Sequence, residues 1–121
     1  MASIFEATAG KLIGPTTGGT VTQATNKATG VTLNAASGQI TLDDAALAAG
    51  AEVSFAVTNS EIAATDVVVV NHSSAGTAGA YLVQANTIAA GSFAITVANL
   101  SAGSLGEAIV LSFVALKGAS S

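Results

Sequence analysis

The stretch "EVSFAVTN", residues 52–59, decides the class of fold. Its apolar residues Val53, Phe55 and Val57 occupy every second position, and mostly polar residues stand between them. Because successive side chains of a strand point to opposite faces, this spacing predicts a β-strand with one face in the core. The next apolar run, "DVVVVN" at 66–71, is apolar on both faces, which predicts a buried central strand.

Similar short runs, separated by turn residues, extend from this pair towards both ends of the chain. Their spacing is typical of sandwiches and barrels. We therefore expect an all-β fold, namely an antiparallel β-sandwich of jelly-roll or Greek-key type with about eight strands, in one domain over 20–121. Residues 1–19, which are rich in glycine, are expected to form an extended N-terminal arm. The other expected strands are "TVTQA" (20–24), "GVTLN" (30–34), "GQITL" (38–42), "AYLVQANTI" (80–88), "SFAITVANL" (92–100) and "EAIVLSFVALK" (107–117).

Two segments carry helical signals within this β pattern. "LDDAALAAG" at 42–50 has acids at its start and Gly50 at its end, which predicts one helical turn or a tight loop. "SLGE" at 104–107 matches a capping box, but the β-branched run that follows it favours a strand.

The chain also contains an internal similarity. "LAAGAEVSFAVTNS" at 47–60 resembles "IAAGSFAITVANLS" at 88–101, at an offset of 41 residues. Two strand pairs of similar construction suit a Greek-key sandwich, whereas two copies are too few for a solenoid.

The composition is unusual in its lack of charge. Half of the residues are apolar, but only 8% are charged, the net charge is −4, and arginine and cysteine are absent. Too few cations are present to neutralise nucleic-acid phosphates or to bind an anionic membrane, so neither partner is expected. No secretory signal or apolar stretch long enough for a membrane helix is evident, which predicts a protein made in a cytoplasm.

The stretch "NHSSAGTAGAYLVQ" at 71–84 contains the features most suggestive of chemistry. His72 stands beside Ser73 and Ser74, yet neighbouring residues of an extended chain face opposite sides, and no GxSxG motif is present. A phosphate-binding loop would need a lysine after its glycines, and none is near. We expect no catalytic residue and no cofactor, so the protein is predicted not to be an enzyme.

Acidic residues offer a weaker alternative. Asp43 and Asp44, together with Glu52 or Asp66, could bind a hard cation such as Ca²⁺. The spacing of an EF-hand is absent, and adjacent acids before "AALAAG" are better explained by a helix-turn cap. We therefore expect no metal site.

Taken as an ordered pattern, residues 18–117 resemble small virion proteins of tailed bacteriophages, some of which occur as modules of longer fibre or head proteins. The stretches that carry the resemblance are "GGTVTQATNKATGVTLNAASGQITL", "AALAAGAEVSFAVTNSEIAATDVVVVNHSSAGTAGAYLVQ" and "AAGSFAITVANLSAGSLGEAIVLSFVALK". The resemblance implies a capsid decoration (cement) protein or a head- or tail-fibre module, a β-sandwich that self-associates and has no enzymatic activity.

From this resemblance and the composition we expect a virion protein on the capsid exterior, made in the host bacterial cytoplasm. A homotrimer is favoured over a dimer, with the major capsid protein or another virion protein as the second partner. The alternative is a receptor- or glycan-binding head- or tail-fibre module. The residues expected at an oligomer or capsid interface are Ile4, Phe5, Leu12, Ile13, His72 and Tyr81.

Overall fold

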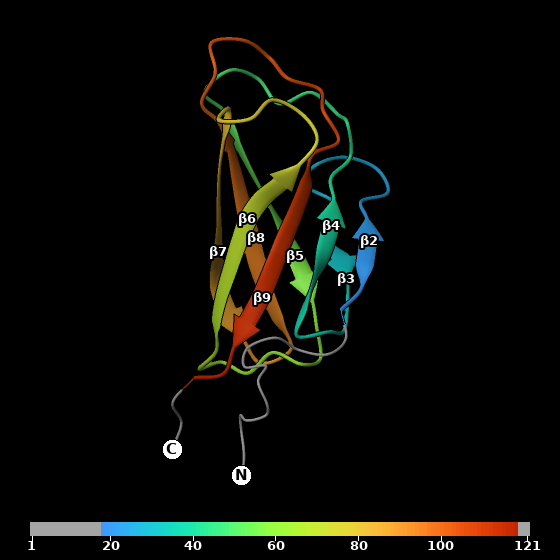
Figure 1. The fold of residues 1–121 in the computed structure, drawn as a ribbon, viewed down its shortest axis with the longest axis vertical. Coiled ribbons are helices and arrows are strands. Elements are labelled where there is room, and N and C mark those ends of the chain that lie inside the picture. Colours follow the sequence, from blue (N-terminus) through green and yellow to red (C-terminus); the bar gives the residue numbers. More distant parts are fainter. Residues whose placement is uncertain (1–17, 119–121) are drawn as a thin grey trace.

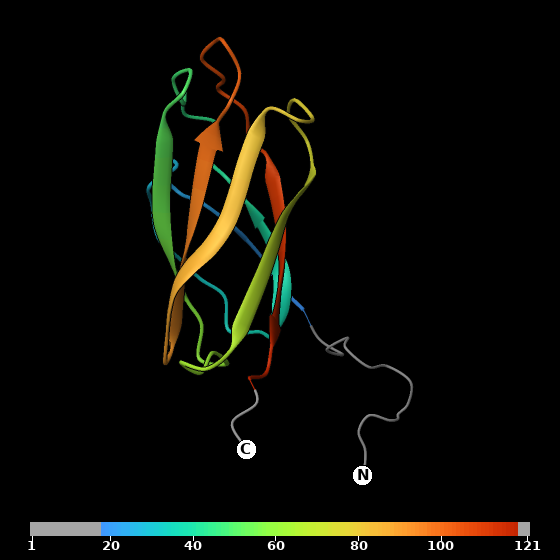
Figure 2. The ribbon, with the colours of Figure 1, turned by 90° about the vertical axis from the view of Figure 1, so that its left-hand side faces the viewer.

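A computed structural model of the chain describes residues 18–118. It confirms the all-β prediction: eight strands form two four-stranded sheets that pack face to face as a sandwich (Figures 1 and 2). The strands are β2 (Thr20–Thr22), β3 (Val31–Thr32), β4 (Ser37–Thr41), β5 (Glu52–Thr58), β6 (Val67–Ser74), β7 (Tyr81–Ala89), β8 (Ser92–Asn99) and β9 (Val110–Leu116).

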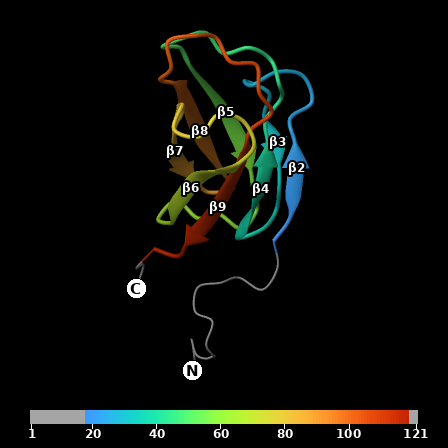
Figure 3. The same ribbon diagram turned by 45° about the horizontal axis from the view of Figure 1, so that its top comes forward.

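The order of the strands is the same in both layers. One sheet runs β2-β4-β9-β6 and the other β3-β5-β8-β7, so every connection except the hairpin between β7 and β8 passes from one sheet to the other (Figure 3). The four central pairings are antiparallel, whereas β2 pairs with β4, and β3 with β5, in parallel. Each sheet therefore consists of three antiparallel strands and one parallel strand at its edge, which is β2 in one sheet and β3 in the other.

This topology gathers the loops into two groups. Four of the connections between sheets lie at one end of the sandwich, called here the crossover end, and both ends of the described chain lie at the other, the terminal end (Figure 1). The crossover end comprises residues 23–30, 42–51, 75–80 and 100–109. The terminal end comprises residues 33–36, 59–66, 90–91 and Gly118.

The core lies between the sheets and is built from alternate strand residues. In β8 the burial alternates without exception, with Phe93, Ile95 and Val97 at 0–1% exposure. Phe93 packs on Phe113 of β9 with ring centroids 5.4 Å apart. The predicted inward face of "EVSFAVTN" is confirmed, because Phe55 and Val57 are buried and Val53 packs against the core.

The position of the four-valine run differs from the prediction. β6 is an edge strand, not a buried central one, and Val67 and Val69 are 55% and 42% exposed. The run is apolar on both faces, which is the pattern of a strand covered on both sides, but only the face with Val70 is buried in this chain.

The two segments with helical signals are irregular loops. Residues 42–50 contain no helix and are held by a bridge in which Leu47 and Leu105 exchange backbone hydrogen bonds. The loop alternative for 42–50 is thus the observed one. Residues 104–107 precede the strand β9, as the β-branched run favoured.

The internal similarity corresponds to neighbouring strands. β5 and β8 pair antiparallel over seven residues, and each contributes its apolar positions to the core. An offset of 40 residues, rather than 41, superposes the buried positions, since Phe55, Val57 and Asn59 then match Ile95, Val97 and Asn99. The loops before the strands, which include Gly50 and Gly91, keep the offset of 41.

Candidate functional site

Lys27 organises the crossover end. Its ammonium group donates hydrogen bonds to the backbone carbonyl of Asp43, to that of Ala45 at 2.7 Å and to that of Glu107 at 2.9 Å. These acceptors come from two other crossover loops, so one side chain joins three of the four loops. Lys27 is 3% exposed, and this burial lowers its pKa, although Asp43, Asp44 and Glu107 oppose the shift.

Gln23 completes this arrangement. Its side-chain amide donates to the carbonyls of Lys27 and Thr29, both at 3.0 Å, and its oxygen accepts from the Asp43 amide at 2.9 Å. Gln23 is also 3% exposed. Because buried polar groups are costly unless they are hydrogen-bonded, this network indicates a rigid support for the loops rather than a reactive centre.

Glu107 attaches the fourth crossover loop. Its carboxylate accepts hydrogen bonds from the Thr77 amide at 2.9 Å, the Thr77 hydroxyl at 2.8 Å and the Tyr81 hydroxyl at 2.7 Å. The bonds from Tyr81 and Thr77 lower the pKa of Glu107. Burial, together with the hydrogen bond to Glu107, raises the pKa of Tyr81. Glu107 is therefore an ionised carboxylate that accepts a hydrogen bond from the neutral phenol of Tyr81.

His72 lies on β6 beside this pair and holds the loop that follows it. Its Nε2 contacts the carbonyl oxygens of Ser74 at 3.1 Å and Ala75 at 2.6 Å. Since both partners are acceptors, Nε2 carries the hydrogen and donates it. The ring meets Tyr81 edge-on, with centroids 5.5 Å apart. The Ser73 hydroxyl donates to the Val110 carbonyl instead, so His72 and Ser73 do not form a nucleophile–base pair.

A pocket of about 250 Å³ lies over this loop. Several of its lining residues have left-handed backbone, and Ala75, at φ 62°, is not a glycine. No acid, lysine or arginine lines the pocket, so it offers hydroxyl, imidazole and backbone groups rather than charge, and it lacks the lysine of a phosphate-binding loop. The lining residues are His72, Ser73, Ser74, Ala75, Gly76, Ala78, Gly79 and Tyr81.

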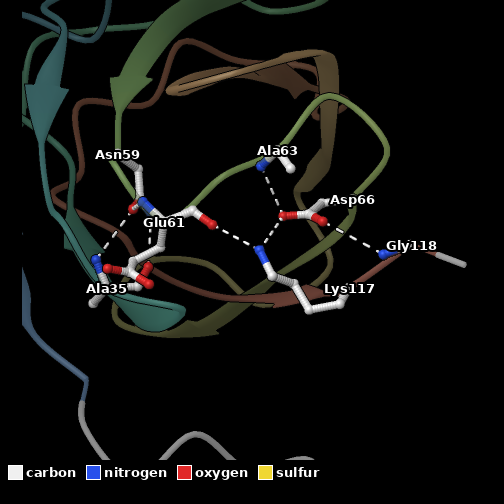
Figure 4. A network of polar contacts seen from close by, with 7 residues as sticks. All are labelled: Ala35, Asn59, Glu61, Ala63, Asp66, Lys117 and Gly118. Carbon is white, nitrogen blue, oxygen red and sulfur yellow. Dashed lines mark hydrogen bonds and ion pairs between the residues drawn. The ribbon is translucent and has the colours of Figure 1, made fainter. Parts of the chain in front are cut away.

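The terminal end has its own polar cluster, shown in Figure 4. Asp66 accepts hydrogen bonds from Lys117 at 2.8 Å and from the Ala63 amide at 2.9 Å, and Lys117 also donates to the Glu61 carbonyl at 2.8 Å. The hydrogen bond from Lys117 is the main cause of the lowered pKa of Asp66. This cluster fixes the last described residues against the loop between β5 and β6.

Of the acids considered for a cation, Asp66 lies at the opposite end of the sandwich from Asp43 and Asp44. Asp43 is at the crossover end, where its carboxylate accepts from the Ala45 amide at 2.8 Å, and Asp66 is paired with Lys117 at the terminal end. Within residues 18–118, no three His, Asp or Glu side chains are close enough together to hold a metal ion. The same part of the chain contains no helix long and apolar enough to cross a membrane.

The flanks of the sandwich, between its two ends, are almost free of charge. In the eight strands that the structure describes, Glu52 is the only residue among Asp, Glu, Lys and Arg. The other charged residues of 18–118 lie in the loops at the two ends. The large apolar side chains that are exposed are Val67, Val69, Leu82, Leu100 and Leu116.

The residues expected at an interface are only partly within the described chain. His72 is partly buried and Tyr81 is 9% exposed, and both support the loop at 75–80. Ile4, Phe5, Leu12 and Ile13, and nearly all of the expected arm, lie outside the described residues. The sequence did not indicate the roles of Gln23, Lys27 and Glu107: the first two have no signal beyond their polarity, and the match of Glu107 to a capping box pointed to a different role.

Comparisons with known proteins add nothing to this geometry. No protein-family model, curated protein or solved structure matches the chain.

Proposed function

We propose that this chain is a structural virion protein of a tailed bacteriophage, a capsid decoration protein that stabilises the head by binding its exterior as an oligomer. The observation that carries the proposal is the charge-free flank of the sandwich. A free monomer with a net charge of −4 would gain solubility from charge on its sides, yet within residues 18–118 the charged residues other than Glu52, the first residue of β5, lie in the loops at the two ends.

Three further features agree with this role. Val67, Val69 and Leu116 leave apolar area on one flank, and burial of such area supplies about 25 cal/mol per Å² on assembly. The small side chains that dominate the flanks lose little conformational entropy when a neighbour covers them. Buried polar contacts at both ends, of Lys27 at the crossover end and of Asn59 at the terminal end, make the unit rigid, so repeated copies can pack identically.

The resemblance of residues 18–117 to small virion proteins is the remaining support. It covers nearly the same part of the chain as the sandwich. It does not distinguish decoration from a fibre position, and the two positions predict different copy numbers in the particle. A decoration protein occurs in proportion to the major capsid protein, whereas a fibre module occurs in a few copies.

The test is binding of the full chain to purified capsids that lack it. We expect saturable occupancy in proportion to the major capsid protein, and particles that resist heat or low salt better when occupied. The variant that lacks residues 1–17 then tests the arm: a large loss of occupancy supports a role in attachment, and unchanged occupancy removes the arm from the mechanism. No binding of the full chain at any concentration contradicts decoration.

One observation favours the alternative of a glycan- or receptor-binding fibre module. The pocket of about 250 Å³ lies at the crossover end, opposite both ends of the described chain, where a module attached through its termini would present it. Its uncharged polar lining suits a hydroxylated ligand. We expect this role to show as binding of the isolated chain to host surface polysaccharide. Ala78→Trp, which fills the pocket, should abolish that binding, and Ala56→Trp on the flank should not.

A further inference from the structure

Over residues 67–71 the free edge of β6 has none of the features that keep edge strands apart. Natural edges are protected by charge, proline, bulges or shortness. β6 has eight residues, "VVVVNHSS", without charge or proline, and its single irregularity lies between His72 and Ser74. Residues 67–71 therefore form an uninterrupted and uncharged strand edge.

The core is also incompletely closed along this side. β7 lies at the edge of the other sheet, next to β6 (Figure 2). Its side chains Val83, Ala85 and Ile88 pack against the core but are only partly buried. On the opposite side of the sandwich, Leu33 fills the space beside Gly19 and Gly38. A strand added at β6 would extend the sheet on the side where apolar area remains exposed.

The edge is suited to a second copy of itself. Val69 is the middle residue of 67–71. An antiparallel pairing centred on it places Val69 opposite Val69, Val68 opposite Val70, and Val67 opposite Asn71. No like charges oppose each other in this register, although each chain carries −4 overall. The other edge of the same sheet, β2, has three residues and would pair over a shorter length.

We propose that two copies of this chain associate through β6 about a two-fold axis at Val69, which joins their sheets into one sheet of eight strands. The proposal rests on the self-association in the proposed function and names its surface. A two-fold contact uses the same strand on both copies and closes at a dimer, whereas the trimer favoured from the sequence needs two different surfaces. The exposed side chain of Val69 then lies at the two-fold axis, and that of Val67 lies beside Asn71 of the other copy.

The first test measures the mass of the full chain in solution by sedimentation. We expect twice the chain mass of 11.6 kDa. Val69→Lys places two ammonium groups opposite each other and should weaken the dimer by about 5-fold or more while the chain stays folded, because this side chain points outward. Ala56→Lys, on the outer face of the other sheet, adds the same charge and should leave the dimer intact. A monomeric or trimeric native chain overturns the proposal.

The second test fixes the register, and it benefits from the absence of cysteine. Directly opposed residues of antiparallel strands have Cα atoms about 5 Å apart, within reach of a disulfide. Val69→Cys should therefore form a covalent dimer on mild oxidation. Val67→Cys alone should not, because its two copies lie about 13 Å apart along the strands. Mixing Val67→Cys with Asn71→Cys should restore the cross-link. Equal cross-linking by Ala56→Cys, or none by Val69→Cys, overturns the register.

These measurements use no capsid, so they separate the two proposals. A dimer through β6 that does not bind capsids leaves this inference standing and contradicts decoration. A native monomer that occupies capsids overturns this inference and leaves decoration standing.

Discussion

Asn59 and Asn99 are equivalent residues at opposite ends of two neighbouring strands, and neither has any exposed surface. The Asn59 side chain donates to the Ala35 carbonyl at 2.6 Å and accepts from the Glu61 amide at 3.0 Å. The Asn99 side chain donates to the Leu47 carbonyl at 2.8 Å and accepts from the Ser101 amide at 2.9 Å. One residue thus secures the terminal end and the other the crossover end.

Replacement of either asparagine by alanine should destabilise the fold strongly. Asn99→Ala leaves the carbonyls of Leu47 and Gly103 without their side-chain donor, and Asn59→Ala does the same to Ala35. We expect each to lower the free energy of unfolding by about 2–4 kcal/mol, measured by urea denaturation. Asn34→Ala, which removes one exposed hydrogen bond, is the matched control and should cost less than about 1 kcal/mol. Equal losses at all three positions would show that burial of the amide is not the cause.

The two described lysines should differ sharply when each is replaced by methionine. Lys27→Met removes the donor from three carbonyls at the crossover end, partly offset by removal of a buried charge, so we expect a loss of about 2–4 kcal/mol. The Lys117 side chain is 67% exposed, and its ion pair with Asp66 should contribute at most about 1 kcal/mol. Thermal and urea unfolding of both variants measures the difference. A Lys27→Met protein as stable as the parent would mean that the loops do not need this junction.

Acid should destabilise the protein through Glu107 and Asp66. In the folded state the pKa of each carboxyl group lies below its ordinary value, which is 4.5 for Glu107 and 3.8 for Asp66. Their contribution is therefore complete above those values and is lost as the pH falls through the lower pKa of the folded state. Urea unfolding at a series of pH values should show a slope below about pH 4.5, and Glu107→Gln should make it shallower. An unchanged slope in Glu107→Gln would exclude this carboxylate as a source.

The single tyrosine offers a direct readout of the same contact. Because the pKa of Tyr81 is raised above its ordinary 10.0, tyrosinate absorbance should appear at higher pH in the folded chain than in urea. The stability that this shift represents is present below pH 10 and is lost as the pH rises further. In Glu107→Gln the folded titration should move towards lower pH, since the neighbouring negative charge is gone. Identical titrations of the folded and unfolded chains would argue against a buried, hydrogen-bonded phenol.

Alanine substitutions at two glycines of the 75–80 loop should distinguish the cost of backbone strain from the cost of steric contact. Gly76 and Gly79 both have left-handed backbone, at φ 75° and 81°. A Cβ at Gly79 would meet nothing within 4 Å, so Gly79→Ala should cost only the strain, about 1–2 kcal/mol. At Gly76 it would lie 2.5 Å from Ile109 Cγ2 and 2.8 Å from Glu107 Oε1. Gly76→Ala should therefore destabilise more and also move Tyr81 fluorescence. Equal effects of the two changes would mean that the loop yields around Gly76.

The repeat illustrates what local sequence could and could not predict about the site. The alignment at an offset of 41 pairs Asn59 with Leu100 and pairs buried positions with exposed ones, so the equivalence of Asn59 and Asn99 emerged only from the structure. The sequence did not indicate the roles of Lys27, Gln23 and Glu107 either. Their roles depend on carbonyl groups and hydroxyls of other loops, as in the 80-residue separation between Lys27 and Glu107.

The sequence by itself determined the all-β class, the number of strands and the core face of β5, because the alternation of side chains in a strand is a local property. Only the tertiary structure decided which strands are neighbours, because pairing joins residues that are distant in the chain. It placed β6, with its four valines, at the edge of a sheet, and it paired β2 with β4 and β3 with β5 in parallel. It also showed that "NHSSAGTAGAYLVQ" contains the fourth crossover loop, residues 75–80, which Glu107 joins to the other loops through Thr77. An apolar run shows that burial is favourable, but it does not show whether the covering surface comes from the same chain or from another copy.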